Sequence, residues 1–310
     1  MQSSQIPNLT DLDIEVISDA PISLRTYFGI GGSAEILAIP HSMQALSTLI
    51  KRCNEINTPI HILGKGANLL VCDSGIHGIV VSLEQEFFKT LTSSQQSDGI
   101  EVKIMGGADL SKSLMHTSRN GLHGLEAMAG IPASIGGAIR MNAGGKYGEI
   151  SDNLESFSCL TNTGEEKTYF KDEFRFSYRE SNIKEPIITS ATFLLQEDNP
   201  NSVREKIKDI FEWKKTRQPL SNTSAGCVFK NPMTDTGERV SAGWLIDKVG
   251  LKGSMIGGAS VSNQHANFIT TKKTANTSDV LSLIKRIERQ VYDDTGIHLE
   301  REVVVWGSNK

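Results

Sequence analysis

A glycine- and alanine-rich stretch at residues 126–149 (EAMAGIPASIGGAIRMNAGGKYGE) limits the possible folds of this chain more than any other feature. Such a run lacks the bulky side chains that build a core, but glycine has no Cβ and tolerates positive φ, so this backbone can approach a ligand or another element closely. Residues 134–137 are expected to present successive N–H groups of the kind that cradle phosphate oxygens. A tight packing corner between a helix and a sheet is the alternative. The density of glycine and the flanking Asn142 favour a ligand-binding loop.

Length and composition are typical of an ordinary soluble protein. At 310 residues it is long for a single core, so two or three domains are expected. The net charge is −4 and no basic run suggests nucleic acid. The N-terminus lacks the shape of a signal peptide, and no apolar run reaches the length of a membrane span. We therefore expect a cytoplasmic protein, a monomer, with no nucleic-acid partner and no membrane insertion.

The four cysteines, Cys53, Cys72, Cys159 and Cys227, are scattered without paired spacing. Neither a zinc site nor a disulfide framework is indicated by this pattern. The prediction is four free thiols and no bound metal.

Periodicity divides the chain into three regions. Residues 1–77 begin with a leader over 1–22 that packs loosely or caps the domain, and continue with an amphipathic helix over 42–57 and strands at 59–64 and 69–73. Residues 78–200 form an α+β region that contains the glycine-rich stretch. Its elements are strands at 78–83, 100–105, 155–161 and 187–195 and one helix at 109–119.

The third region, residues 201–310, contains two helices with one apolar stripe each, over 202–216 and 278–293. Gly296 ends the second helix, and a strand over 298–306 closes the chain. Three parts are thus expected. The last strand of the third part is expected to return to the active site.

Seven segments, taken together and in order, carry a resemblance. They resemble the UDP-N-acetylenolpyruvoylglucosamine reductases, the MurB flavoenzymes of bacterial cell-wall synthesis. The resemblance covers nearly the whole chain, about residues 24–307. The segments are TYFGIGGSAE (26–35), LGKGANLLV (63–71), the glycine run 130–148, FSYRES (176–181), TRQP (216–219), SAGCVFKNP (224–232) and LEREVVVWG (299–307).

The resemblance implies an α+β fold: an FAD-binding domain of the vanillyl-alcohol-oxidase type in two subdomains, 1–77 and 78–200, and a substrate-binding domain, 201–310. It also implies a reaction in which hydride passes from NADPH through non-covalent FAD to the enolpyruvyl ether of UDP-N-acetylglucosamine, giving UDP-N-acetylmuramate for peptidoglycan. No G-x-G-x-x-G motif of the Rossmann type introduces a βαβ unit here, and this family needs none.

Cofactor binding is assigned to the glycine turns, whose backbone N–H groups are expected to surround the pyrophosphate. Other roles are equally typical of these residues. Gly31-Gly32 alone could form a plain turn, and Lys65 could be a solvated charge in a loop. Asn68 and Asn142 could cap turns. The cofactor-binding positions implied by the resemblance are Gly31, Gly32, Gly64, Lys65, Gly66, Ala67, Asn68, Leu69, Gly130, Ile131, Pro132, Ser134, Ile135, Gly136, Gly137, Asn142, Ala143 and Gly144.

Three residues match the catalytic positions of the family. When hydride reaches the β-carbon of the enolpyruvyl group, negative charge spreads from the α-carbon into the carboxylate, so the site needs a fixed cation and an acid. Arg179 matches the family's arginine, whose planar fork suits a carboxylate. Glu302 matches the C-terminal glutamate; alternation along a strand does not decide between Glu302 and Glu300, and the family motif favours Glu302.

Cys227 departs from the family, which usually has a serine here as proton donor to the α-carbon. A thiol has a reference pKa of about 8.5 and is a better acid than an alcohol. A buried inert cysteine is the alternative. We interpret Cys227 as the proton donor.

Further residues are candidates for the substrate or the nicotinamide cofactor, each equally compatible with a surface, packing or capping role. The interval between Ser181 and the strand at 187 is short, which is typical of the type II form that lacks a substrate-covering tyrosine loop. The substrate-binding candidates are Tyr178, Arg217, Lys230, Asn231 and Gln264, with His265 beside them.

Two other functions stay open at this point. A flavin-retaining protein that lost catalysis at Cys227 would be yellow but would not oxidise NADPH with the enolpyruvyl substrate. A sugar or alcohol oxidase on the same scaffold would consume oxygen without a nicotinamide. The presence of both Arg179 and Glu302 favours the reductase.

Overall fold

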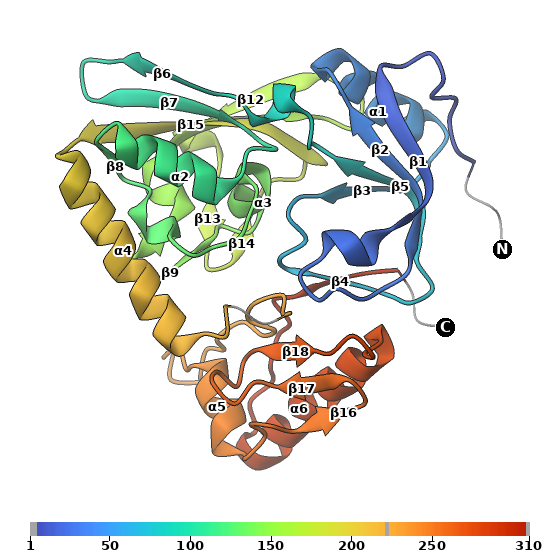
Figure 1. The fold of residues 1–310 in the computed structure, drawn as a ribbon, viewed down its shortest axis with the longest axis vertical. Coiled ribbons are helices and arrows are strands. Elements are labelled where there is room, and N and C mark those ends of the chain that lie inside the picture. Colours follow the sequence, from blue (N-terminus) through green and yellow to red (C-terminus); the bar gives the residue numbers. More distant parts are fainter. Residues whose placement is uncertain (1–4, 221–222, 308–310) are drawn as a thin grey trace. The chain divides into compact units, whose positions relative to one another are not determined.

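The computed structural model describes residues 5–220 and 223–307 (Figure 1). The start of the expected leader, residues 1–4, lies outside this part, as do residues 221–222 and 308–310. The chain forms two compact units that interleave in sequence. Unit 1 comprises the described residues up to Ser18, Glu35–Lys65 and His77–Lys214; unit 2 comprises Asp19–Ala34, Gly66–Ile76 and the described residues from Lys215 onward. The division into three domains at 77 and 200 stays a prediction.

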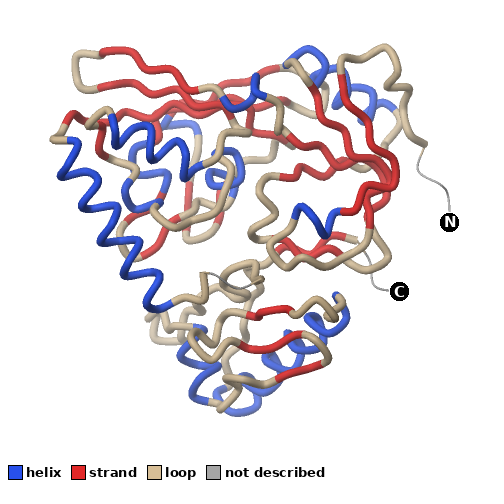
Figure 2. The backbone as a smooth tube through the Cα atoms, in the orientation of Figure 1, coloured by secondary structure: helices blue, strands red, loops and turns tan. Residues whose placement is uncertain are grey.

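The larger sheet of unit 1 is antiparallel, and helices α2 and α3 pack against it. Leu110 and Leu114 of α2 and Ile135 and Ile139 of α3 share one buried core with strand residues such as Phe193. Figure 2 shows the two helices beside these strands. The elements are β12 (Glu166–Phe170), β11 (Leu154–Leu160), β15 (Ile187–Glu197), β7 (Ile100–Met105) and β6 (Leu91–Gln95) in sheet order, β8 (Leu122–His123) on β15, α2 (Leu110–Arg119) and α3 (Ile135–Arg140).

A second sheet, mainly in unit 1, has the order β1-β2-β5-β3 and packs against helix α1. The buried stripe of α1 is the one that the sequence predicts, Leu46, Leu49, Ile50 and Cys53, and the Ser42 hydroxyl accepts from the Ala45 N–H to cap the helix. The elements are β1 (Ile14–Pro21), β2 (Ser33–Pro40), β5 (Ile76–Ser82), β3 (Ile60–Leu63) and α1 (Met43–Glu55).

The glycine-rich stretch runs through short elements between β8 and β11, and a long helix follows β15. Figure 1 shows this helix, α4, as the long yellow helix. These remaining elements of unit 1 are η2 (Glu86–Lys89), η3 (Glu126–Met128), β9 (Gly144–Gly145), β10 (Gly148–Glu149), η4 (Ile150–Asn153), η5 (Lys171–Glu173), β13 (Phe176–Ser177), β14 (Glu180–Ser181) and α4 (Pro200–Arg217), which continues into unit 2.

Unit 2 packs helices α5 and α6 against a three-stranded antiparallel sheet, and its last strand lies parallel to β4. Asn276 and Asp279 form a capping box at the start of α6, and Gly296 ends the helix at φ 70°. The elements are η1 (Ile22–Arg25), β4 (Leu69–Val71), α5 (Ala242–Lys248), β16 (Met255–Ile256), β17 (Ala259–Val261), β18 (Ile269–Thr271), α6 (Thr277–Thr295) and β19 (Val304–Trp306).

Two sequence expectations are wrong. The leader is not loose throughout, because residues 14–21 form strand β1 at the edge of the second sheet. The closing strand expected over 298–306 is confined to Val304–Trp306. Residues 300–302 bond instead to the segment 228–230, so the chain changes its pairing partner before β19 begins. The helices expected at 42–57, 109–119, 202–216 and 278–293 are confirmed within about two residues at each end.

Among the helices that the structure describes, none has the length and apolar character needed to cross a membrane.

Candidate active site

Two of the glycine segments meet in unit 1. A Cβ built on Gly64 would lie 2.6 Å from the Ser134 hydroxyl, so only glycine allows the two loops to approach this closely. The neighbouring Lys65 is exposed, as expected of a loop charge, and its ammonium lies 2.8 Å from the Asp109 carboxylate. Burial alone would raise the pKa of Asp109, but the hydrogen bonds from Lys65 and from the Lys112 N–H outweigh it and lower that pKa.

The N–H groups at the start of α3 contradict the expectation of a free phosphate cradle at residues 134–137. The Ile135 N–H donates to Ala108 O at 3.0 Å, and the Gly136 N–H to Gly106 O at 2.9 Å. The Gly137 N–H donates to the Ser134 hydroxyl, which caps α3. Here the glycines serve close packing: a Cβ on Gly136 would lie 3.1 Å from Ile188 O. Any phosphate contact of this segment must therefore come from other atoms.

Asn142 is fully buried in the left-handed region, at φ 42°. Its amide nitrogen donates to the Glu149 carboxylate at 2.5 Å and to Ser177 O at 3.1 Å, while its Oδ1 has no hydrogen-bond partner in the structure. A buried polar oxygen left in this state is costly unless a ligand donates to it. Asn142 thus offers a hydrogen-bond acceptor to a bound molecule.

Tyr178 and Arg179 form the two-residue tip of the β13–β14 hairpin, whose register pairs Ser177 with Glu180. Arg179 lies at φ 60°, in a turn position that favours glycine. A bulky side chain in the left-handed region is strained, and such strain gathers at functional sites. The Arg179 guanidinium lies 5.2 Å from the centre of the Tyr178 ring, and its Nη1 is buried.

In unit 2 the other glycine pair packs against the turn that follows β4. A Cβ on Gly31 would lie 2.5 Å from Val71 O, and one on Gly32 would lie 2.5 Å from Asp73 O. The Gly32 N–H donates to Cys72 O at 3.0 Å. Gly66 lies at φ 65° against the backbone of Arg25. Close backbone packing therefore accounts for these glycines within the unit.

Cys227 is half-buried, whereas Cys53, Cys72 and Cys159 are buried. Gly226 before it takes φ 78°, so the chain turns immediately ahead of the thiol. The segment after Cys227 is held on one side by Asn267, whose carbonyl accepts from the Val228 N–H at 2.8 Å and whose side chain bonds both backbone groups of Phe229. The backbone around Cys227 is therefore constrained, while the exposure of its thiol stays a prediction.

Glu302 lies on the other side of this segment. Its N–H donates to Val228 O at 2.8 Å, directly after Cys227, and its carbonyl accepts from the Asn68 side chain at 2.9 Å. Asn68 therefore anchors the C-terminal segment through Glu302. Glu300 is engaged in an ion pair, 2.7 Å from the ammonium of Lys230, whose side chain is 13 % exposed. The choice of Glu302 over Glu300 stays a prediction.

The other substrate candidates lie at different places in unit 2. Asn231 accepts from the Ala242 N–H at 2.9 Å and so supports the start of α5. The Arg217 guanidinium contacts the Thr216 hydroxyl. Gln264 donates to Lys215 O at 3.2 Å and also borders a pocket of about 350 Å³. His265 is half-buried, and burial lowers its pKa.

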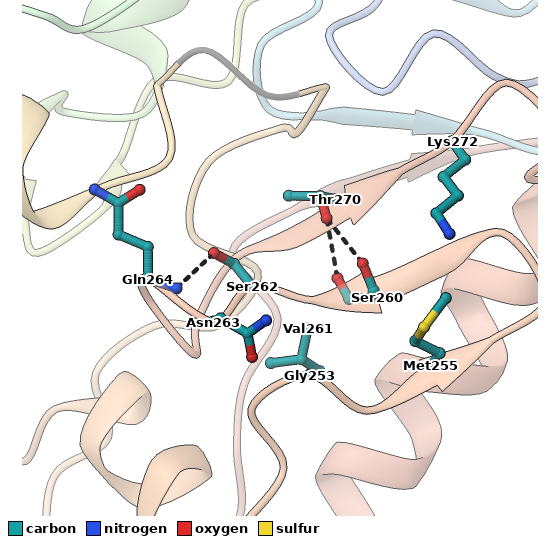
Figure 3. Close-up of a pocket in the computed structure, with 9 residues that line it drawn as sticks. All are labelled: Gly253, Met255, Ser260, Val261, Ser262, Asn263, Gln264, Thr270 and Lys272. Carbon is teal, nitrogen blue, oxygen red and sulfur yellow. Dashed lines mark hydrogen bonds between the residues drawn. The ribbon is translucent and has the colours of Figure 1, made fainter.

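This pocket lies over the sheet β16-β17-β18, and several polar side chains occur along its lining (Figure 3). The hydroxyls of Ser260 and Thr270 point toward one another at 3.0 Å, with Lys272 toward one end and Gln264 toward the other. Its lining residues are Gly253, Met255, Ser260, Val261, Ser262, Asn263, Gln264, Thr270 and Lys272.

Each unit thus holds a subset of the predicted residues. In unit 1 lie Gly64, Lys65, Gly130, Ile131, Pro132, Ser134, Ile135, Gly136, Gly137, Asn142, Ala143, Gly144, Tyr178 and Arg179. In unit 2 lie Gly31, Gly32, Gly66, Ala67, Asn68, Leu69, Arg217, Cys227, Lys230, Asn231, Gln264 and Glu302.

One residue was missed by the sequence prediction: Lys214 of α4, whose side chain is buried against the glycine-rich stretch. A signal for it existed. Val203, Ile207 and Ile210 form the apolar stripe of α4, and position 214 continues that stripe at helical spacing. A lysine on the buried face of a helix indicates a specific role.

The residues of unit 1 fit an FAD molecule in one respect. Asn142 Oδ1 is a buried acceptor without a donor, and a bound molecule can supply that donor.

Comparisons with known proteins agree with this description. A family model described as an FAD binding domain matches residues 34–169, which defines the chain as a flavoprotein of α+β fold. A second model, described as the C-terminal domain of UDP-N-acetylenolpyruvoylglucosamine reductase, matches residues 218–306.

Relatives that match over nearly their whole length are named UDP-N-acetylenolpyruvoylglucosamine reductase. The enzyme of Lachnoclostridium phytofermentans is 38 % identical over 94 % of this chain and 93 % of its own length, and that of Listeria innocua is 36 % identical over 96 % and 97 %. The crystal structure of the enzyme from Thermus caldophilus has a TM-score of 0.77 at 33 % identity, covering 95 % of this chain and 99 % of its own. The chain belongs to the UDP-N-acetylenolpyruvoylglucosamine reductase family.

Proposed function

We propose that this chain reduces UDP-N-acetylglucosamine enolpyruvate to UDP-N-acetylmuramate, a precursor of peptidoglycan, with NADPH as reductant and FAD as cofactor. Family membership over nearly the whole length supports the reaction. The single observation in the structure that supports the proposal is the backbone hydrogen bond from the Glu302 N–H to Val228 O, which brings residue 302 to the segment that directly follows Cys227. FAD, when bound, supplies transfer of hydride between NADPH and the substrate.

We assign cofactor binding to the two sets of glycine segments, each within its own unit. In unit 1 these are the residues around Gly64 and Ser134, with Asn142 as acceptor. In unit 2 they are Gly31-Gly32 and residues 66–69. Because the N–H groups of residues 135–137 are used within the chain, the glycines there act by allowing close approach rather than by donating.

Arg179 is assigned to the carboxylate of the enolpyruvyl group. Arg179 lies at the tip of a hairpin in a left-handed conformation, and a guanidinium fork can donate to both carboxylate oxygens. As the β-carbon gains hydride, charge develops on that carboxylate, so a cation held rigidly in place stabilises the transition state.

Cys227 is assigned as the proton donor to the α-carbon. Two electrons arrive as hydride at the β-carbon, and the proton from the thiol completes the reduction; solvent then reprotonates the thiolate. Glu302 polarises the developing enolate together with Arg179. The partial exposure of Cys227 suits a group that must exchange its proton with water in every turnover.

The nucleotide sugar is assigned to Tyr178, Arg217, Lys230, Asn231 and Gln264. Gln264 borders the pocket of Figure 3, whose hydroxyls and Lys272 provide donors for a phosphate or sugar. We further propose that the protein acts in the cytoplasm as a monomer, on a small-molecule substrate.

Anaerobic assay of the purified protein tests the reaction. The expected result is a yellow protein that oxidises NADPH rapidly only when the enolpyruvyl nucleotide is present, in a one-to-one ratio with UDP-N-acetylmuramate formed. A yellow protein that leaves NADPH unchanged would select a non-catalytic flavin-binding role instead, which Cys227 in place of serine makes a specific alternative. Oxygen consumption with an alcohol or sugar and no nicotinamide would identify an oxidase.

A further inference from the structure

Arg140, the last residue of helix α3, holds the loop that leads out of the hairpin of Arg179. Its half-buried guanidinium donates to Ile183 O at 2.6 Å and also to Glu185 O. Both acceptors lie between β14 and β15, where residues 182–186 form neither helix nor strand. A guanidinium presents its N–H donors in a fixed planar fork, so this one side chain holds two main-chain carbonyls at a set spacing.

A second contact joins the same end of α3 to the hairpin itself. The Ser181 hydroxyl donates to Arg140 O at 2.9 Å, and Ser181 pairs with Phe176 in the β13–β14 ladder. Figure 1 shows α3 beside β14. The main chain of Arg140 therefore holds the second strand of the hairpin, and its side chain holds the loop that follows that strand.

The first strand of the hairpin is held by a residue two positions further along the chain. The Asn142 side chain donates to Ser177 O at 3.1 Å, and Ser177 directly precedes the two-residue tip. Residues 140–142 thus contact both strands. Arg179 lies in the tip at φ 60°, a conformation that costs free energy and persists only where the surrounding structure holds it.

We propose that Arg140 is a positioning residue that keeps the β13–β14 hairpin, and with it Arg179, in the place from which Arg179 binds the carboxylate of the enolpyruvyl group. The inference rests on the proposed function, which assigns that carboxylate to Arg179, and adds a residue outside the predicted set. Arg140 uses its guanidinium for the main chain and takes no part in the chemistry. A displacement of about 1 Å in a substrate-binding group can cost about 10²-fold in rate, so a loosened hairpin should slow the reaction without the loss of any group that touches substrate.

Three substitutions separate positioning from general stability. Arg140→Lys keeps the positive charge but replaces the fork with a compact ammonium, which cannot hold two carbonyls at the same spacing. Ser181→Ala removes only the hydroxyl that bonds to Arg140 O. Arg119→Lys is the matched control, because Arg119 ends α2 as Arg140 ends α3 and its side chain is exposed.

Amide hydrogen exchange of the purified proteins without nucleotide reports on the hairpin directly. In Arg140→Lys the peptide that covers residues 175–183 should exchange about 10-fold faster, and in Ser181→Ala about 3-fold faster, because a charge-assisted hydrogen bond is worth more than a neutral one. A peptide from α6 should stay within about 2-fold of its wild-type rate in every variant. Unchanged exchange at residues 175–183 in both variants would overturn the inference, as would equally faster exchange throughout unit 1.

Rapid anaerobic mixing of the FAD-loaded proteins tests the link to Arg179. In Arg140→Lys, flavin reduction by NADPH should stay within about 2-fold of the wild-type rate, and reoxidation by the enolpyruvyl nucleotide should slow about 10-fold or more. Arg119→Lys should slow neither phase. In an Arg179→Ala background, Arg140→Lys should slow reoxidation by less than about 2-fold further, because a residue that acts through Arg179 then has nothing to position.

Equal slowing of both phases, or the full further loss in the Arg179→Ala background, would give Arg140 a merely structural role and overturn the inference. Should Arg140→Lys lose its fold or its flavin, Ser181→Ala decides the question: it should slow reoxidation alone, by about 3-fold, and a wild-type rate together with wild-type exchange would contradict the inference. Failure of the wild-type protein to reduce the nucleotide would instead refute the proposed function, and the exchange of residues 175–183 distinguishes the two failures because it needs no substrate.

Discussion

Arg179 of unit 1 takes a left-handed backbone conformation itself, whereas in unit 2 the positive φ next to Cys227 belongs to Gly226. Arg179 lies at the tip of a two-residue hairpin, and Lys214 of the same unit is buried. Cys227 and Glu302 lie on extended segments held by backbone hydrogen bonds, with the thiol partly exposed. The region in unit 1 places its cations in a strained or buried position. The region in unit 2 places its proposed acid, Cys227, in a position that is neither strained nor fully buried.

This difference follows from what each group is proposed to do. A cation that stabilises developing charge must stay fixed in a place of low polarity, so rigidity and burial are useful. An acid must give up a proton and regain it, so contact with water is useful. Substitutions in one region should therefore alter charge recognition or stability, and substitutions in the other should alter proton delivery.

The largest expected effect is that of Glu302→Gln, which removes a negative charge from unit 2 and keeps the shape of the side chain. Reduction of the enolpyruvyl nucleotide should slow by about 10²- to 10³-fold, since a lost transition-state contact costs this much. Rapid-mixing absorbance of the flavin measures this step apart from reduction by NADPH. Glu300→Gln, which breaks only the ion pair with Lys230, is the control and should change the rate by less than about 3-fold. Loss of FAD in Glu302→Gln would assign the residue a structural role.

Next in size is a pH effect on stability in unit 1. The pKa of Lys214 in the folded protein is about 8, below its ordinary 10.5, because of burial and then Arg179. Above pH 8 the folded protein releases this proton while the unfolded chain keeps it, so stability rises with pH in this interval. Between pH 8 and 10 the free energy of unfolding of the wild type should therefore gain up to about 2 kcal/mol relative to Lys214→Gln.

Urea unfolding of both proteins at several pH values measures this gain. Lys208 is an exposed lysine of the same helix, and the difference between Lys208→Gln and the wild type should stay constant over the same range. A constant difference for Lys214→Gln as well would mean that Lys214 keeps an ordinary pKa and that burial does not constrain its charge.

A smaller effect tests the junction of the two glycine segments. Gly64→Ala places a Cβ 2.6 Å from the Ser134 hydroxyl but 3.6 Å from Ser134 Cβ, an ordinary contact. We expect Gly64→Ala to cost about 2 kcal/mol through overpacking and Ser134→Ala about 1 kcal/mol through the lost cap. The double variant should cost about 1 kcal/mol less than the sum, because removing the hydroxyl relieves the clash. Additive costs, measured by urea unfolding, would show that the two loops do not touch.

The smallest effect concerns the strain at Arg179. Arg179→Gly relieves a left-handed conformation worth about 1–2 kcal/mol but adds chain entropy of about 0.5–1 kcal/mol, so the protein should become about 0.5 kcal/mol more stable. Tyr178→Gly, at the adjacent turn position with no positive φ, should lower stability instead. Thermal unfolding of both variants checks the sign. A less stable Arg179→Gly would mean that the contacts of the side chain outweigh the strain.

Local signals in the sequence were sufficient for much of the fold. Helix α1 follows from its stripe, and the expected helix at 109–119 begins at Asp109, whose side chain caps it by accepting from the Lys112 N–H; cap and helix lie within four residues of one another. Gly296 ends α6 for the same kind of reason. The acceptors for the N–H groups of α3, Ala108 and Gly106, come from a distant loop, so the sequence around Ser134 does not reveal them.

The candidate site likewise has features that the sequence predicts and features that it does not. The resemblance placed Arg179, Cys227 and Glu302 in the site by motif, but the left-handed φ of Arg179 depends on hairpin closure and is not visible in the motif. Lys214 was overlooked because a lysine next to Trp213 and Lys215 reads as a solvated helix face, although helical spacing from Ile210 places it inward.

The most direct test of the proposed proton donor is flavin absorbance after rapid anaerobic mixing of Cys227→Ala, first with NADPH and then with the enolpyruvyl nucleotide. The flavin should be reduced by NADPH within about 2-fold of the wild-type rate, and its reoxidation by the nucleotide should slow by about 10²-fold or more, while Cys227→Ser stays active. Reoxidation at the wild-type rate, or an equal loss in both phases, would contradict the role of Cys227 as the acid that completes the reduction.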